Sequence, residues 1–477
     1  MLRETGAAMA FDGQWIEEAK RIVGSEGVLV EREAMAGYTG DEFPLEDLKR
    51  LPRAVVKPRT EEEVARIVAL CGRTKVPVTA RGGGTGLSGG CVPSEGGVVL
   101  SLERLNQIVE CDPATSSITV EAGVTLSKMY EEVDRMGLFF PPHPGDEGAF
   151  VGGVVATNAG GSRAVKYGTV RRFVLGLRVI AASGEVVELG GKFIKSSSGY
   201  DLLDLMTGSE GTLGIITRVT LSLVPRPGSL ATLVAPFATD VEAIRAVPAI
   251  LAAGIVPCAV EFVEHSAMRC AERRLGKEWP ARAGGASLMI IVDGRDENAV
   301  LAEAESISGI LERGGAREVL VADGREKQAE ILALRSSMYE AIRPAVAELF
   351  DTSVPRSEIA GHVESIHRLE KELGLQMPTY GHAADGNVHT HFLHHSIEDG
   401  VIGEEVPGWR DNHDKVRAAL FADAVSRGGV ISGEHGIGIV KRDYLSRTAN
   451  PGALEMMRRV KRALDPEGIL NPGKVLG

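Results

Sequence analysis

The chain has 477 residues, a length at which a single hydrophobic core gives way to two or three lobes. Hydrophobic residues make up 44% and charged residues 25%, the composition of an ordinary globular protein. The formal net charge of -12 and the isoelectric point near 5.5 argue against non-specific nucleic-acid binding and against anchoring on anionic lipid.

The first predicted elements form a β-α-β unit. The apolar pattern predicts, in chain order, a helix over 14–23, a strand within 51–57, a helix capped by Thr60 and a strand over 76–79. A glycine-dense stretch at 81–90 follows. The elements predicted after it are strands over 97–102, 108–111 and 117–122, a helix over 126–137, a hairpin of 174–181 with 185–189, and a strand over 215–224.

A lobe boundary is predicted at the turn-forming sequence Pro-Arg-Pro-Gly of 225–228. Beyond it, strands predicted over 231–235, 287–292 and 318–321 alternate with helices over 240–253, 298–313 and 326–345. This alternation predicts an α+β lobe with helices against an antiparallel sheet. From about residue 423 the pattern is helix, glycine turn, helix. We therefore divide the chain into 1–226, 227–422 and 423–477.

The glycine-dense stretch contains GTGLSG at 84–89, which formally matches G-x-G-x-x-G. A dinucleotide-binding loop should open directly into a helix, but Pro93 and the pair Gly96-Gly97 follow and are poor helix formers. The context therefore argues against a Rossmann loop for NAD. Six glycines within 82–90 could instead let backbone N–H groups approach a diphosphate, and a glycine-rich turn without a ligand is the plainer alternative.

Two further small-residue blocks decide between these interpretations. They lie within 141–168, which includes PPHPG at 141–145 and GGVVATNAGG at 152–161, and at 208–217, which reads GSEGTLGIIT. In order and spacing, the three blocks closely resemble the FAD-binding domain of the vanillyl-alcohol oxidase type of flavoprotein. The resemblance implies an α+β, two-lobed protein: an FAD-binding domain (1–226), an α+β cap or substrate domain (227–422) and a C-terminal segment (423–477) that completes the FAD site.

In such proteins FAD lies extended, with its diphosphate on the first loop and its isoalloxazine beside the second block. Some relatives attach FAD through a loop histidine. No histidine occurs in 81–90, and the nearest is His143, where many relatives carry Asp, so we expect non-covalent FAD. The resemblance implies these cofactor-binding residues: Arg81, Gly82, Gly83, Gly84, Thr85, Gly86, Ser88, Gly89, Pro144, Gly145, Gly152, Gly153, Ala156, Asn158, Gly160, Gly161, Ser162, Tyr167, Gly168, Glu210, Gly211, Gly214, Ile215, Ile216 and Asn471.

A histidine and glutamate pattern marks the second half of the chain. It consists of GHAADGNVH at 381–389 and SGEHGIG at 432–438. Two imidazoles and a carboxylate suit zinc, iron or manganese. His391 shares a strand face with His389, so the pattern alone does not choose between them. The alternative, that these are structural core or surface histidines, is weakened by the glycine-flanked clustering. His394 and His395 are expected at a strand end without chemistry.

These segments resemble the metal site of the D-lactate, glycolate and D-2-hydroxyglutarate dehydrogenase branch. That resemblance implies that His382, His389 and Glu434 bind a divalent metal (Fe, Zn or Mn) and that His435 is the catalytic base. It also suggests Arg335 as the anchor of the substrate carboxylate, with Arg356 as a second candidate. Tyr339 and Asn387 complete the expected substrate site. In the 2-hydroxyglutarate branch a lysine stands where Leu349 stands here, which favours D-lactate or glycolate over a dicarboxylate.

The expected reaction is hydride transfer from a small 2-hydroxy acid, D-lactate first, to the flavin N5. Glycolate and D-2-hydroxyglutarate are alternative substrates. A flavin-dependent oxidase, an aryl-alcohol or sugar oxidase and a non-catalytic electron-transfer subunit are alternative functions. None of the five cysteines forms a CxxC pair, so electrons must leave through an external carrier such as electron-transfer flavoprotein, or an iron–sulfur or cytochrome partner. No apolar run approaches about 20 residues and no leader pattern opens the chain, so we expect a cytoplasmic protein without a membrane span.

Overall fold

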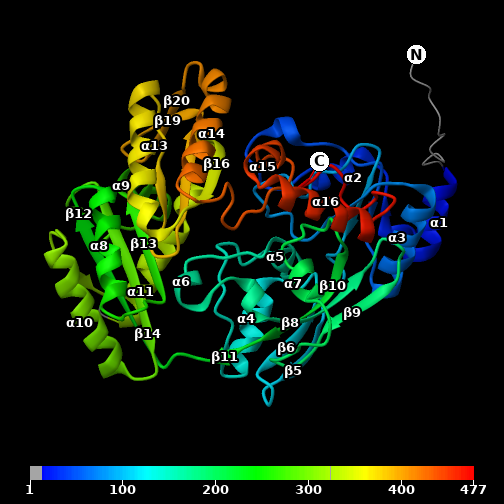
Figure 1. Cartoon of the computed structure of the whole chain (residues 1–477), viewed down its shortest axis with the longest axis horizontal. Helices are drawn as coiled ribbons and strands as arrows, with labels where there is room; N and C mark the ends of the chain where they lie inside the picture. Colours follow the sequence, from blue (N-terminus) through cyan, green and yellow to red (C-terminus); the bar gives the residue numbers. More distant parts are fainter. Residues whose placement is uncertain (1–12, 323, 477) are drawn as a thin grey trace. The chain divides into compact units, whose positions relative to one another are not determined.

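The computed structural model of the chain describes residues 13–322 and 324–476. They divide into two compact units. Unit 1 comprises residues up to 159, 169–225 and 435–477, and unit 2 comprises 160–168 and 226–434. Figure 1 shows the elements of both. The expected absence of an N-terminal leader concerns mainly residues 1–12, which lie outside the described part.

Unit 1 opens with the expected β-α-β unit. Strands β2 and β3 both run parallel to β4, and β1 pairs antiparallel with β2. Helix α3 begins where the sequence predicts, because Thr60 Oγ1 accepts a hydrogen bond from Glu63 N at 3.2 Å. The elements are α1 (Gly13–Val23), β1 (Val28–Leu29), α2 (Arg32–Met35), β2 (Val55–Val56), α3 (Glu61–Thr74), β3 (Val78–Arg81) and β4 (Val98–Ser101).

The other large sheet of unit 1 is antiparallel, in the order β5-β6-β10-β8-β9. The expected hairpin is β8 with β9. Helix α5 packs beside β6 and β10, and the small pair β7 with β11 closes the segment. The elements are β5 (Ile108–Asp112), β6 (Ser117–Glu121), α4 (Leu126–Arg135), β7 (Leu138–Phe139), α5 (Val151–Thr157), β8 (Val174–Ile180), β9 (Val186–Gly190), α7 (Leu202–Met206), β10 (Ile215–Ser222) and β11 (Val224–Pro225).

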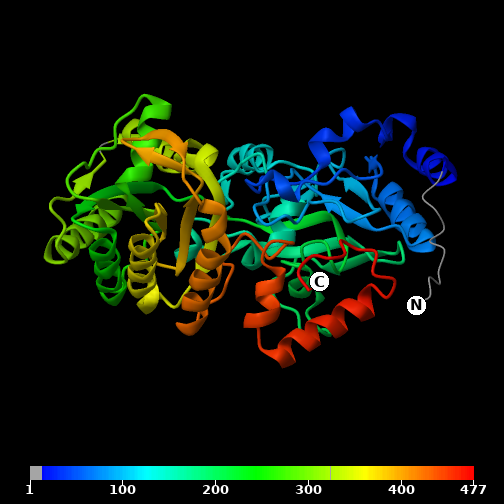
Figure 2. The ribbon, with the colours of Figure 1, turned by 90° about the horizontal axis from the view of Figure 1, so that it is seen from above.

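The C-terminal stretch completes unit 1 through helices α15 (Arg442–Thr448) and α16 (Pro451–Leu464). Leu470 forms a parallel bridge with Val78 at the start of β3, and Lys461 Nζ donates to the carbonyls of Thr212 and Leu470 at 2.7 and 2.8 Å. Figure 2 shows this stretch in red. Leu470 therefore lies beside the strand that leads into the first glycine loop.

Unit 2 is built on an antiparallel sheet in the order β15-β12-β14-β13-β17-β18-β16, as expected for an α+β lobe. Helices α8, α10, α13 and α14 form one layer, and α9, α11 and α12 pack together as another. The strands are β12 (Ser229–Phe237), β13 (Ala259–Glu264), β14 (Ala286–Gly294), β15 (Leu320–Val321), β16 (Val346–Ser353), β17 (Thr379–His382), β18 (Asn387–Leu393), β19 (His395–Glu398) and β20 (Val401–Glu405).

The helices of unit 2 are α6 (Ala164–Tyr167), α8 (Asp240–Ala252), α9 (His265–Leu275), α10 (Glu297–Arg313), α11 (Gly324–Ser336), α12 (Met338–Ile342), α13 (Ile359–Leu373) and α14 (Trp409–Ser426). The single helix predicted over 326–345 is instead α11, α12 and a 3₁₀ turn that contains Pro344, since proline has no N–H to continue a helix. The sequence pattern also missed β13, β16 and β17, whose runs are buried on both faces and lack a simple alternation, whereas the strand expected to carry His389 and His391 is β18.

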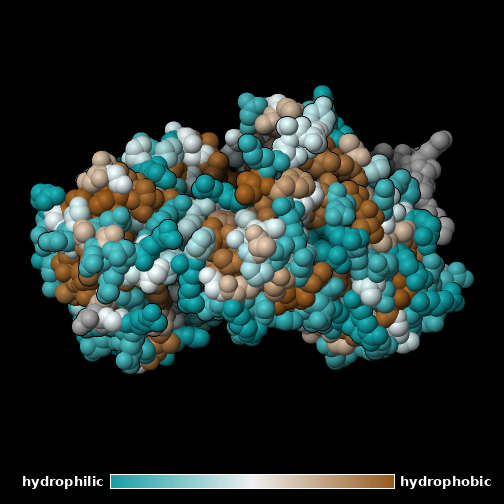
Figure 3. Space-filling model, turned by 90° about the horizontal axis from the view of Figure 1, so that it is seen from below, coloured by the Kyte–Doolittle hydropathy of each residue, from teal (hydrophilic) through white to brown (hydrophobic). Residues whose placement is uncertain are grey.

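Two domain boundaries differ from the predicted ones. Residues 423–434 belong to unit 2, because α14 continues to Ser426 and Val430 bridges Ser353 of β16. Residues 160–168 also pack with unit 2, although the sequence places them within the FAD-binding domain. Within the described residues, no helix combines the length and apolar character needed to cross a membrane. On the face in Figure 3, hydrophobic residues form separate patches between hydrophilic ones.

Candidate functional site

The first glycine loop leaves β3 and contains no helix before β4, as expected for a loop that is not a Rossmann turn. Gly84 and Gly89 have φ of +79° and +74°, which other residues adopt only with strain. The position of a Cβ on Gly82 would lie 3.6 Å from Gly153 Cα, so the first and second glycine blocks lie side by side. Arg81 donates to the carbonyl of Gly40 and lies over the Tyr38 ring.

The second block forms the short helix α5, in which the consecutive residues Gly152 and Gly153 have different surroundings. A Cβ on Gly152 would lie 2.5 Å from the Ala122 side chain, so this glycine allows close packing on the sheet. A Cβ on Gly153 would meet no protein atom within 4 Å, so this position faces open space suited to a ligand. Asn158 ends the helix with φ +51°, and its Oδ1 accepts from Thr169 Oγ1 and Arg171 N.

Three expected cofactor residues instead connect the C-terminal stretch to the loops. Ser88 Oγ donates to the carbonyls of His435 and Gly436 at 3.1 and 3.0 Å. The carboxylate of Glu210 accepts from the backbone N–H groups of 437 and 438 at 2.8 and 2.7 Å. Asn471 Nδ2 donates to the carbonyls of Gly90 and Glu210. These side chains fix the loop, and we propose that they position the cofactor site rather than contact the cofactor directly.

Other expected cofactor residues are core residues. Ile215 and Ile216 are 1% and 5% exposed, and Gly214 is glycine because a Cβ there would lie 2.4 Å from a Val179 methyl group. Pro144 and Gly145 lie in the loop before α5, where a Cβ on Gly145 would meet open space. His143 stacks on the Tyr130 ring and its Nε2 lies 3.2 Å from Glu147 Oε1.

The 160–168 segment is held to unit 2 by Asp293 at the end of β14. Lys166 Nζ donates to the carbonyl of Asp293 at 2.9 Å and also to its carboxylate, and Tyr167 Oη donates to the same carboxylate. A Cβ on Gly160 would lie 2.7 Å from Glu434 Oε2. The segment that the sequence assigns to the flavin site therefore touches a residue that the sequence assigns to the metal site.

One face of the unit 2 sheet carries the polar site. Register pairs Glu261 with His382, Tyr380 with His389, and Asp351 with His389. Because opposed residues on paired strands share a face, all these side chains project from the same side of the sheet. The sequence predicts His382 and His389 here, but neither Glu261 nor Asp351.

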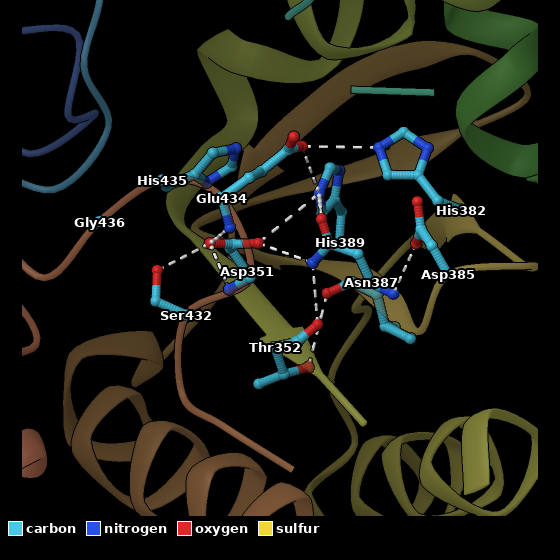
Figure 4. Close-up of polar contacts among 12 residues, drawn as sticks. Asp351, Thr352, His382, Asp385, Asn387, His389, Ser432, Glu434, His435 and Gly436 are labelled. Atoms are coloured by element: carbon cyan, nitrogen blue, oxygen red, sulfur yellow. Dashed lines mark hydrogen bonds and ion pairs between the residues drawn. The ribbon is translucent and has the colours of Figure 1, made fainter. Parts of the chain in front are cut away.

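The structure brings the three expected metal ligands together (Figure 4). Glu434 Oε1 lies 3.5 Å from His382 Nε2 and 3.3 Å from His389 Nε2, and the three donor atoms lie within 4.8 Å of one another. Donors about 2.0–2.1 Å from a shared ion stand roughly 3–3.5 Å apart. His382 Nε2 makes no hydrogen bond within the described residues. The donor set therefore fits a divalent metal.

Charges in the cluster shift the pKa values of its members. Burial opposes ionisation of Glu434 and Glu261, but the neighbouring histidines, together with Arg335 at Glu261, hold the pKa of both carboxyls below their usual range, and that of Glu434 well below it. Burial also opposes a charged His382, yet the Glu261 and Glu434 carboxylates raise its pKa well above the usual value. The cluster is thus built to hold positive charge between carboxylates.

Asp351 holds the glutamate loop on the sheet. Its carboxylate accepts from Ser432 Oγ at 2.9 Å and from the N–H groups of Gly433 and Glu434 at 3.1 Å each. It also accepts from Asn387 Nδ2 at 2.7 Å, and Asn387 donates a second time to the Thr352 carbonyl. The Asn387 amide group is therefore used within the fold, and we propose a positioning role for it in place of the expected substrate contact.

Arg335 lies in this site and Arg356 does not. Arg335 donates to the Glu261 carboxylate and lies 4.9 Å from the centre of the Tyr380 ring, while its Nε makes no hydrogen bond within the described residues. Tyr339 lies nearby, with its ring 5.9 Å from His391. Arg356 is exposed in a 3₁₀ turn after β16. The structure therefore supports Arg335 over Arg356 as an anchor for an anionic substrate.

The other histidines of this region, His391, His394 and His395, lie outside the cluster of expected metal ligands. His391 shares the face of His389, but its Nδ1 lies 2.9 Å from the Pro378 carbonyl and its ring stacks on Tyr380 at 4.4 Å. The candidate metal clusters of the described residues contain His389 and not His391. His394 follows the end of β18 and His395 begins β19, so both lie at a strand end as expected, with their Nδ1 atoms 2.8 Å apart.

His435 follows Glu434 directly. Consecutive Cα atoms stand about 3.8 Å apart, so the chain itself keeps this histidine beside a metal ligand. Its role as a base stays a prediction. Leu349 is 6% exposed in β16 and pairs with His391, so it brings an apolar side chain, not a cation, to this face.

Comparison with known proteins identifies the family. The family model "FAD linked oxidases, C-terminal domain" matches residues 226–475, and the model "FAD binding domain" matches residues 52–190. The chain belongs to the FAD-linked oxidases. This FAD-linked oxidase is an oxidoreductase that uses FAD, which confirms the prediction of a flavoprotein.

Curated relatives match this FAD-linked oxidase over nearly its whole length. A D-lactate dehydrogenase of Archaeoglobus fulgidus is 42% identical over 97% of this chain and 99% of its own. A D-lactate dehydrogenase of Anaerostipes hadrus is 39% identical over 97% of both chains. The glycolate oxidase subunit GlcD of Bacillus subtilis is 35% identical over 92% of this chain and 91% of its own.

Solved structures confirm the vanillyl-alcohol oxidase type of fold. A 4-ethylphenol oxidase from Gulosibacter chungangensis superposes with a TM-score of 0.79 at 21% identity, over 100% of this chain and 99% of its own. A p-cresol methylhydroxylase superposes with a TM-score of 0.77 at 19% identity, over 97% of this chain and 96% of that one.

Proposed function

We propose that this FAD-linked oxidase is a metal-dependent dehydrogenase that oxidises a small 2-hydroxy acid, D-lactate first, to the 2-oxo acid. The observation that carries the proposal is the convergence of His382, His389 and Glu434 within 4.8 Å, with Arg335 on the same sheet face. The names of the full-length relatives support the substrate class.

Each part of the substrate has a counterpart in the site. The carboxylate would pair with Arg335, whose Nε has no hydrogen-bond partner within the described residues. His382, His389 and Glu434 would hold the metal, and His435, next to Glu434 in the chain, would take the hydroxyl proton. When bound, the metal would lower the pKa of the substrate hydroxyl and FAD would accept the hydride from the α-carbon.

The 160–168 segment supports hydride transfer at this place. Gly160 is so close to Glu434 that a Cβ would lie 2.7 Å from its Oε2. The same segment contains Gly161 and Tyr167, which the resemblance places at the isoalloxazine. Within unit 2, a part of the block that the resemblance places beside the isoalloxazine therefore lies next to an expected metal ligand.

The apolar Leu349 favours a monocarboxylate, since a second substrate carboxylate would lack a cation at that position. Glycolate is the second candidate, because the GlcD subunit of Bacillus subtilis is also similar over 92% of the chain. We further propose that the electrons pass to an external carrier, such as electron-transfer flavoprotein.

A substrate screen with metal analysis tests the proposal. Purified protein should contain FAD and about one divalent metal ion, and should reduce a dye with D-lactate faster than with glycolate, D-2-hydroxyglutarate or L-lactate. Turnover that is unaffected by complete removal of metal would exclude the metal-dependent mechanism. A strong preference for D-2-hydroxyglutarate would show that the inference from Leu349 is wrong.

A further inference from the structure

Glu261 is a buried carboxylate shared between a metal ligand and the candidate substrate anchor. One oxygen, Oε1, lies 2.5 Å from His382 Nδ1, and the other, Oε2, accepts from the Arg335 guanidinium. The residue is 1% exposed, so no solvent replaces either partner. Both oxygens of one side chain are thus used for two different parts of the site.

Strand register fixes this arrangement. Glu261 in β13 pairs directly with His382 in β17, which places both side chains on one face of the sheet. Arg335 approaches the same face from α11 and packs over the Tyr380 ring. Since two strands and a helix determine the three positions, the contacts do not depend on a mobile loop.

The contact with Glu261 determines which nitrogen of His382 is available to a metal. An ionised carboxylate can only accept, so the Nδ1 of His382 must carry the proton that it donates. When the ring gives up its second proton to bind a metal, the lone pair is therefore on Nε2, which lies 3.5 Å from Glu434 Oε1 and makes no hydrogen bond within the described residues. A carboxylate behind a ligating histidine fixes its tautomer and ring orientation.

We propose that Glu261 is the positioning residue of this site, which fixes the metal-binding tautomer of His382 and the orientation of Arg335 at the same time. This inference rests on the proposed function, because it assumes that His382 binds a metal and Arg335 a substrate carboxylate. An amide in place of the carboxylate has a single acceptor oxygen. The amide oxygen can accept a hydrogen bond from His382 or from Arg335. The amide NH₂ group then faces the N–H group of the other residue, and two donors cannot form a hydrogen bond.

The chain contains a matched control on the opposite face of the same sheet. Glu348 in β16 is also 1% exposed, and its carboxylate also binds one histidine and one arginine, here both through Oε2, with His413 at 2.7 Å and Arg417 at 2.9 Å. Glu348 pairs with Phe392 and so points away from the face that carries His389, and the candidate metal clusters of the described residues contain neither Glu348 nor His413. Replacing Glu348 therefore disturbs a buried carboxylate, a histidine and an arginine without touching the metal site.

The experiment compares Glu261→Gln, Glu261→Ala and Glu348→Gln in the full chain with its FAD retained. Affinity for Zn²⁺ is measured by competition with a chromophoric chelator, which does not depend on turnover. We expect Glu261→Gln to weaken Zn²⁺ binding about 10- to 100-fold and Glu261→Ala to weaken it more, with unchanged FAD content. Glu348→Gln should keep the affinity of the unmodified chain.

Kinetics test the second half of the inference. At saturating Zn²⁺, kcat for D-lactate should recover in Glu261→Gln while KM stays raised about tenfold, because Arg335 has lost its carboxylate. Unchanged Zn²⁺ affinity in both Glu261 variants, or an equal loss in Glu348→Gln, would overturn the inference. If saturating Zn²⁺ restored both kcat and KM of Glu261→Gln to the values of the unmodified chain, Glu261 would not orient Arg335. An unmodified chain that binds no Zn²⁺, Mn²⁺ or Fe²⁺ would overturn the proposed function itself, so the two failures are distinguishable.

Discussion

His389 Nε2 lies 3.3 Å from Glu434 Oε1, although the histidine is in β18 and the glutamate lies in the loop after α14. Asp351 explains this proximity, since its carboxylate binds the Asn387 amide group and the backbone N–H of Glu434. The three expected metal ligands are therefore held by the fold before any ion binds, which favours tight and stoichiometric metal binding.

Replacement of a metal ligand should remove the metal without removing the flavin. His382→Ala or Glu434→Ala leaves two of three ligands, while the glycine blocks 82–90 and 152–153 stay intact. Metal content, measured by elemental analysis, should fall from about one per chain to near zero, and turnover should be lost. FAD absorbance should persist. Full metal content in both variants would contradict the ligand set.

Arg335→Ala should raise KM for the hydroxy acid. Loss of a charge-assisted hydrogen bond to a buried carboxylate costs about 1.5–3 kcal/mol, which corresponds to a roughly 10- to 150-fold change. Steady-state kinetics with D-lactate measure the effect, with metal content as a check that the site is intact. Arg356→Ala is the control, because Arg356 is exposed and should leave KM unchanged. The reverse result would make Arg356 the anchor.

FAD should be released intact by acid precipitation. The loop 81–90 contains no histidine, and His143 is stacked on Tyr130 with its Nε2 near Glu147. The loop therefore has no histidine that could bond to FAD, and the His143 ring is already engaged by Tyr130 and Glu147. The supernatant should carry all of the yellow colour, and chromatography should identify it as FAD. Colour that stays with the precipitated protein would contradict non-covalent binding.

Electrons should leave through an external carrier. None of the five cysteines lies in a CxxC pair, and the structure confirms that the GTGLSG loop does not open into a helix. With D-lactate, the isolated chain should rapidly reduce a dye or electron-transfer flavoprotein, with negligible reduction of NAD and slow reaction with oxygen. Reduction of NAD at a comparable rate without a partner would contradict this expectation.

His367 should stabilise unit 2 in a pH-dependent manner. Its hydrogen bonds to Asp240 and Glu370, at 2.8 and 2.7 Å, raise its pKa to about 10. Because this folded-state pKa lies above the unfolded value of about 6.5, the stabilisation is complete below that value and is lost as the pH rises toward 10. The difference in urea midpoint between the unmodified chain and His367→Gln should therefore be largest near pH 6 and vanish near pH 10. A difference that does not change with pH would contradict the assignment.

Much of the site follows from the sequence, because local patterns carry it. Glycine density and the positions of prolines indicated a glycine-loop lobe and an α+β lobe, and the resemblance of three glycine blocks and two histidine segments to known flavoproteins implied FAD and the residues His382, His389 and Glu434. Thr60 predicted the start of α3, and the structure confirms that cap. These features depend on residues close together in the chain, where backbone geometry and capping act directly.

Only the tertiary structure decided which side chains share a site. Strand register places Glu261 opposite His382 and Asp351 opposite His389, and no local pattern reveals that pairing. The tertiary structure also shows that Arg335 lies in the site whereas Arg356 is exposed. It shows that His391 contacts the Pro378 carbonyl and the Tyr380 ring instead of joining the metal cluster. The packing of the 160–168 segment likewise brings Gly160 to Glu434. The reason is physical: a sequence pattern fixes the face of a strand, but the partner across that face depends on which distant strand completes the sheet.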